Sequence, residues 1–75
     1  NPATSLRHAI SLNDSFRFAK ELFNGDSARM NEVVRLIGEV STLDEAMVIF
    51  NSEVHVDDEN EAVADFMELL KKYFS

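Results

Sequence analysis

Apolar residues recur every three or four positions along most of the 75-residue chain, and short polar segments interrupt them. This spacing is typical of amphipathic helices. It predicts helices over residues 12–24, 27–40 and 43–53, and a last helix that starts between residues 58 and 61 and ends at 74. Because the connecting segments are short, neighbouring helices should run antiparallel. The predicted fold class is therefore all-α, a compact bundle of four helices.

The ends of these helices carry their own signals. Ser11 and Asp26 are suited to cap the first two helices, and Ser41 or Thr42 is suited to cap the third. Gly25 follows the first helix, where a left-handed backbone is common, so we expect a positive φ there. Residues 1–10 should form an arm or a short helical turn, and residues 11–75 a single domain.

The apolar faces are wide for helices of this length. In the first helix the face spans about 160°, with Phe18 at one edge and Phe16 at the other. The last helix has a similar surplus, with Leu69 and Tyr73 at one edge. We expect the shared core to contain the following residues: Phe16, Phe23, Val33, Ile37, Phe50, Phe66 and Leu70.

The surplus apolar surface suggests that something covers it. A contiguous exposed apolar patch is rare on soluble monomers. We predict an interaction surface formed by Phe18, Leu22, Val48, Leu69 and Tyr73. It would meet a second copy, in a two-fold homodimer, or an absent segment of the parent chain. The alternative is that residues 6–10 fold back and cover Phe18.

Charge is distributed unevenly along the chain. The net charge is -7, and residues 37–75 hold ten acidic side chains but only Lys71 and Lys72 as cations. Such a surface repels phosphate backbones, which argues against nucleic acid as a partner. The acidic half is either a solvated face or a partner for the more basic first half, within the chain or between chains.

Two alternatives to protein binding start from particular segments. In "EVHVDDENE", an extended backbone would place Glu53, His55 and Asp57 on one side, where they could bind a small ligand or a divalent metal. The same segment could instead be a loop whose valines close one end of the core. A helix-turn-helix DNA-binding module would use residues 43–53 as its recognition helix, but that helix has no Lys or Arg.

Signals of catalysis and of membrane insertion are missing from the sequence. It has no cysteine, no glycine-rich phosphate loop and no nucleophile–base motif. We therefore expect a non-enzymatic domain without a cofactor. No apolar run is long enough to span a bilayer, and a cytoplasmic location is favoured. Because the chain begins at Asn1 and not at methionine, we expect a processed chain or a domain of a larger protein.

Three segments carry a resemblance to a known family. These are "ISLNDSFRFAKELFNGD", "ARMNEVV" and "VADFMELLKKYF", with Asn13-Asp14 and Asn24-Gly25-Asp26 as the most specific positions. From about residue 6 to 74 the chain resembles the C-terminal domain of a family of uncharacterised bacterial proteins, mainly of the Bacteroidetes. The resemblance implies a fold and a bacterial host but no activity or site residues. The chain departs from the family pattern near Val56, where an aromatic residue is expected.

Overall fold

The computed structural model describes residues 2–75, which form five helices and no strand. The helices are α1 (Pro2–Ala9), α2 (Leu12–Leu22), α3 (Ser27–Glu39), α4 (Leu43–Glu53) and α5 (Glu61–Tyr73). The all-α prediction is confirmed, and the four expected helices end within two residues of the predicted bounds. The short helical turn expected before residue 11 is a helix of eight residues. None of the described helices has the length and apolarity needed to cross a membrane.

The predicted N-caps are confirmed for three helices. In each, the capping side chain accepts a hydrogen bond from the backbone N–H three residues later: Ser11 from Asp14 at 3.1 Å, Asp26 from Arg29 at 2.9 Å, and Thr42 from Glu45 at 3.2 Å. For α5 the cap is Asn60, whose Oδ1 accepts from the N–H of Ala62 at 2.8 Å. These bonds satisfy donors that the first helical turn leaves free, so they fix where each helix begins.

The turn between α2 and α3 has the predicted left-handed backbone. Gly25 has φ of 83°, and Asn24 before it has φ of 55°. The N–H of Gly25 donates to the carbonyl of Ala19 at 2.8 Å, which closes the end of α2. Asparagine and glycine are the residues that tolerate this conformation best.

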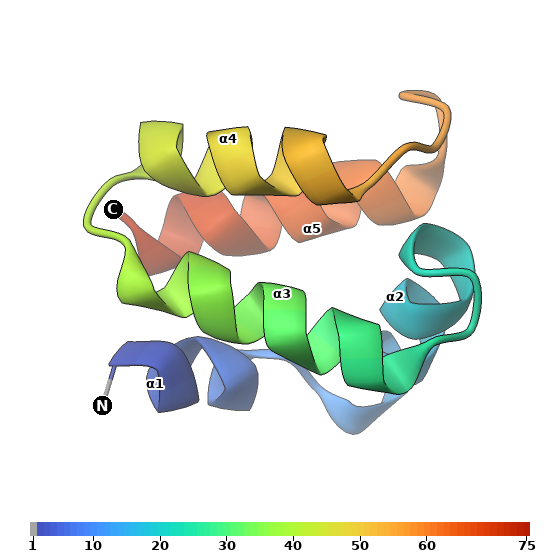
Figure 1. The fold of residues 1–75 in the computed structure, drawn as a ribbon, viewed down its shortest axis with the longest axis horizontal. Helices are drawn as coiled ribbons and strands as arrows, with labels where there is room; N and C mark the ends of the chain where they lie inside the picture. Colours follow the sequence, from blue (N-terminus) through green and yellow to red (C-terminus); the bar gives the residue numbers. More distant parts are fainter. Residues whose placement is uncertain (1) are drawn as a thin grey trace.

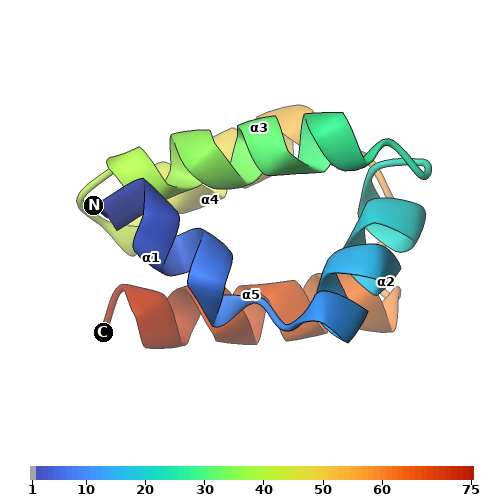
Figure 2. The ribbon, with the colours of Figure 1, turned by 90° about the horizontal axis from the view of Figure 1, so that it is seen from below.

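The helices surround one core (Figures 1 and 2). α3 packs against α1, α2 and α4, and α5 packs against α1, α2 and α4. Figure 2 shows α1 and α2 bridging α3 and α5 at opposite ends of the molecule. α3 and α4 form an antiparallel hairpin, while a longer loop connects α4 to α5.

The core contains all but one of the residues predicted for it. Phe23, Val33, Ile37, Phe50, Phe66 and Leu70 are all buried. Phe16 is the exception, because 65% of its surface is exposed. Its place is taken by Phe18, which is only 2% exposed and whose ring meets Phe66 edge to face at 5.1 Å. The Phe66 ring also stacks on Phe50 at 5.2 Å, so three aromatic rings form the centre of the core.

α1 contributes to this core, as the alternative for residues 6–10 anticipated. Leu6 is fully buried and Ile10 is 6% exposed, and both belong to the same cluster as Phe18. α1 lies along α3 and also touches α5. Residues 6–10 thus fold back onto the domain, while the ring of Phe18 itself is met by Phe66 of α5.

Candidate functional site

The five residues predicted to form the interaction surface do not share one exposed face. Phe18 and Leu22 are 2% and 4% exposed, so the prediction for both is corrected. Their edge of α2 faces the interior between α3 and α5, where packing removes it from water. Leu69 and Tyr73 are half-buried against the core, and of the five only Val48 is exposed, at 70%.

The predicted metal ligands do not converge. The carboxylate of Glu53 receives a hydrogen bond from Arg29 at 2.6 Å, and that of Asp57 accepts the N–H of Glu59 at 2.9 Å. His55 is exposed in the loop between them. Within residues 2–75 no three His, Cys, Asp or Glu side chains are arranged to hold a metal ion. Glu53 thus ties α4 to α3, and Asp57 shapes the loop before α5.

The surface of α4 is acidic where a recognition helix would need cations. Asp44 and Glu45 are exposed in its first turn, and none of its residues is Lys or Arg. Contacts to phosphate or to base edges would lack charged donors there. α4 thus lacks the cations that the helix-turn-helix alternative needs.

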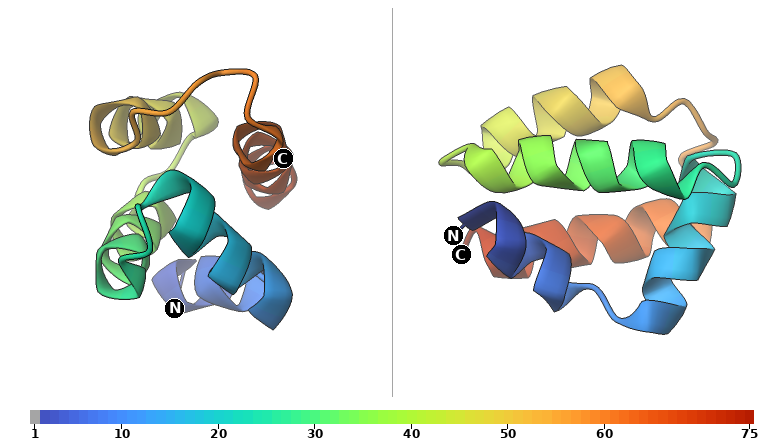
Figure 3. Two further views of the ribbon diagram at one scale, coloured as in Figure 1. Left: turned by 90° about the vertical axis from the view of Figure 1, so that its right-hand side faces the viewer. Right: turned by 60° about the horizontal axis from the view of Figure 1, so that its bottom comes forward.

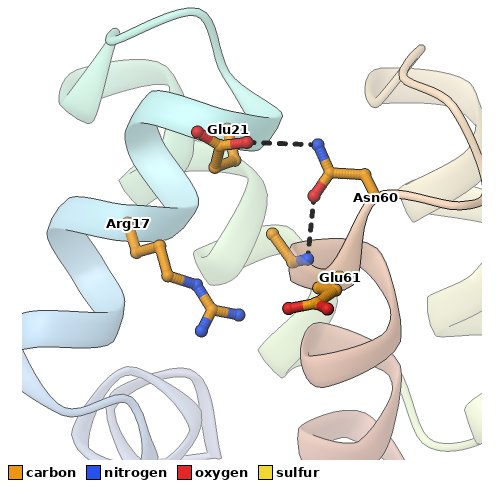
Figure 4. Close-up of a pocket in the computed structure, with 5 residues that line it drawn as sticks. Arg17, Glu21, Asn60 and Glu61 are labelled. Carbon is orange, nitrogen blue, oxygen red and sulfur yellow. Dashed lines mark hydrogen bonds between the residues drawn. The ribbon is translucent and has the colours of Figure 1, made fainter.

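A polar cleft lies between α2 and the start of α5 (Figure 4). Arg17 and Glu21 of α2 face Asn60 and Glu61 across it. Asn60 donates to Glu21 at 3.3 Å, and Arg17 forms an ion pair with Asp65. Because these groups already bind one another, the cleft is better explained as the contact that holds α2 on α5 than as a ligand site.

A second hollow, between α4 and α5, has a different character. Its volume is about 330 Å³, and most of its lining is apolar. The apolar side chains come from both helices and the loop between them: Met47, Phe50, Val54, Val56, Val63 and Met67. α4 and α5 run antiparallel and touch only sparsely, so their facing sides leave a groove. We call this the α4–α5 groove.

An acidic residue, Asp58, lines the α4–α5 groove at the end next to the loop. Asp44 is exposed on α4, one helical turn before Met47. On α5, Lys71 already pairs with Glu68 at 3.3 Å. The groove therefore favours apolar side chains accompanied by positive charge.

Part of this groove could be anticipated from the residue pattern. Met67 stands at the edge of the apolar face of the last helix, and Val54 and Val56 were expected to close one end of the core. The signal was incomplete because the spacing between α4 and α5 depends on the loop that joins them. Periodicity within each helix does not contain that distance.

Two exposed apolar residues lie on one face of α2. Leu12 and Phe16, one turn apart, are 72% and 65% exposed. Lys20, a further turn along the same face, is exposed and has no ion-pair partner among residues 2–75. We call these three residues the α2 patch. This patch was not predicted, because Phe16 was expected in the core.

Together, the fold and these surfaces define a small all-α domain with one apolar groove and one apolar patch. Comparison with models of known families shows which family the chain belongs to. Residues 7–75 match a domain of unknown function, DUF8457, and the chain belongs to that family. No curated protein matches the chain, and no solved structure does.

Proposed function

We propose that the chain is a helical protein-interaction domain whose α4–α5 groove accepts apolar side chains of a partner. The observation that carries the proposal is the groove itself, with six apolar side chains around about 330 Å³. Apolar surface of this kind stabilises a complex when a partner removes it from water.

The acidic residue in the lining supports the same proposal. Asp58 would attract a segment that carries Lys or Arg next to its apolar anchors. Complementary charge of this kind contributes to specificity and to the rate of association. The bacterial host, the place in a larger protein, the cytoplasmic location and the lack of catalytic activity stay predictions from the sequence.

A site-specific photo-crosslinker tests the proposal in cells that make the protein. It is introduced at Ala64, an exposed residue in the lining of the groove, and, as a matched control, at Ala28, an exposed alanine on α3. We expect a discrete crosslinked product from position 64 and none from position 28.

A second variant ties that product to the groove. Asn51→Arg, also in the lining, should remove the crosslink by filling the groove, whereas Asn31→Arg on the outer face of α3 should leave it unchanged. Equal crosslinking from positions 64 and 28, or a product that survives Asn51→Arg, would refute the proposal.

A further inference from the structure

The α2 patch has the chemistry that the α4–α5 groove requires. Leu12 and Phe16 supply two exposed apolar side chains, and Lys20 supplies an unpaired cation on the same face. We propose that the groove is occupied by the α2 patch of a second copy of this chain. This inference rests on the proposed function and names its partner.

The dimensions of the two surfaces agree. With a rise of 1.5 Å per residue, Leu12 and Phe16 stand about 6 Å apart along α2, and Lys20 about 6 Å further. The apolar lining extends from Met47 on α4 to Val54, the C-cap of that helix, which is roughly 10 Å along the helix axis. The groove thus has the length for both apolar side chains, with Asp58 at its end for Lys20.

Charge complementarity points to the same pairing. Residues 37–75, which build the groove, hold ten acids against two lysines, while residues 1–36 hold five cations against four acids. Three of those cations, Arg17, Arg29 and Arg35, already pair with acids of the second half inside the chain. Lys20 is available to do so between chains.

The two surfaces lie on different sides of the molecule. In the left view of Figure 3, α4 and α5 occupy the upper half, and the first turn of α2 lies in the lower half. A chain therefore cannot fill its own groove. The contact is head-to-tail, so each added copy leaves one groove and one patch free. Because few side chains take part, we expect a dissociation constant of the order of 10⁻⁴ M.

Two complementary variants test this arrangement by sedimentation equilibrium. The patch variant is Leu12→Ser with Phe16→Ser, and the groove variant is Asn51→Arg with Ala64→Arg. All four residues are exposed, so both variants should fold. The matched control for the groove variant is Asn31→Arg with Ala28→Arg, which makes the same changes on α3.

We expect the mass of the unmodified chain and of the control to rise with concentration above 8.5 kDa. Each of the two test variants alone should stay monomeric. Their equimolar mixture should form a dimer and nothing larger, because one variant offers only a groove and the other only a patch. Lys20→Glu should weaken association several-fold, and Lys72→Glu, with the same change of charge on another face, should not.

Three results would overturn the inference. They are a strictly monomeric unmodified chain at about 1 mM, a mixture of the two variants that does not dimerise, and a patch variant that still self-associates. If the chain is monomeric but Ala64 crosslinks to a different protein in cells, the proposed function stands and only the second copy is excluded. If Ala64 gives no specific crosslink and the chain is monomeric, both proposals fail.

Discussion

Two phenylalanines show how strongly the environment of a single residue matters in this chain. Phe66 is fully buried between Phe18 and Phe50, whereas Phe16 is 65% exposed on α2. Truncating Phe66 to alanine should lower the free energy of unfolding by roughly 3 to 5 kcal/mol, because it leaves a cavity in a close-packed core. Phe16→Ala should change it by less than about 0.5 kcal/mol.

Urea denaturation of the two variants, followed by circular dichroism, measures this difference. Phe16→Ala is the matched control, since it removes the same atoms from the surface. A well-folded Phe66→Ala protein with unchanged stability would mean that the aromatic centre of the core is wrongly placed.

Gly25 carries a conformational requirement at the turn between α2 and α3. Its φ is 83°, and nothing lies within 4 Å of the position that a Cβ would occupy. The cost of Gly25→Ala therefore comes from the backbone alone, and we expect about 1 kcal/mol of destabilisation. Thermal melting checks this, with Ala28→Gly in α3 as a comparison for helix propensity. An unchanged melting temperature for Gly25→Ala would contradict the left-handed turn.

Glu32 on α3 should titrate abnormally. Its carboxylate accepts a hydrogen bond from Arg35 at 2.6 Å, and this bond and the charge of Arg35 lower the pKa of Glu32 below its ordinary value of 4.5. A carboxyl group whose pKa falls on folding contributes stability above its unfolded pKa and loses it as the pH falls through the folded pKa. Carbon-13 NMR should give a midpoint below 4.5 for Glu32. Arg35→Gln should raise it, and an unshifted midpoint would contradict the pair.

At the level of elements, the short helix α1 completes the core by packing against α3 and α5. Leu6 is fully buried although α1 has only eight residues. An isolated helix of this length is unstable in water, so α1 depends on its packing against α3. Leu6→Ala should therefore destabilise the whole domain by about 2 to 5 kcal/mol. Chemical denaturation measures this, with the exposed Leu12→Ala as control, and equal stability of the two variants would show that α1 is dispensable.

The helices and their caps were predictable because their causes are local. Asp26 caps α3 through a bond to the N–H of Arg29, three residues away, and Gly25 turns the chain regardless of distant packing. That Phe18 is buried while Phe16 is exposed could not be predicted from local signals. Periodicity gives the width of the apolar face of α2, but the position of α5 decides which edge is buried, since Phe66 comes from there.

At the scale of the whole molecule, the charge asymmetry is partly used inside the fold. Arg17 of α2 pairs with Asp65 of α5, and Arg29 of α3 with Glu53 of α4. Both pairs join the more basic first half to the acidic second half, as one of the two interpretations of the charge pattern anticipated. Exposed ion pairs contribute only about 0 to 1 kcal/mol each, so they orient the helices more than they stabilise them. Of the acids that no ion pair uses, Asp58 lines the α4–α5 groove.

The candidate site was less predictable than the fold for a related reason. The interaction surface was expected at the edges of apolar faces, and of its five residues only Val48 is exposed. The α4–α5 groove exists because two helices lie antiparallel with sparse contact, which is a property of their placement. The α2 patch follows from the orientation of one helix. Neither is encoded in the spacing of residues along a single helix.

Packing is also uneven across the molecule, and this leads to a prediction about its dynamics. α3 buries five residues and touches three other helices, whereas α4 buries only Ala46 and Phe50. Regions with few buried apolar contacts open locally before the whole protein unfolds. We therefore expect amides of α3, such as those of Val34 and Ile37, to exchange with solvent only through global unfolding. Amides in the middle of α4 should exchange through a smaller opening.

Native-state hydrogen exchange at increasing denaturant concentration distinguishes the two classes of amide. Those of α3 should have the free energy and denaturant dependence of global unfolding, and those of α4 lower values of both. The groove-filling Asn51→Arg variant changes an exposed residue of α4 and serves as a control, because it should leave the α3 amides unaffected. If α3 and α4 exchanged with the same free energy, α4 would be as firmly held as the core. The groove would then be a fixed feature of the surface and not one that a partner can widen.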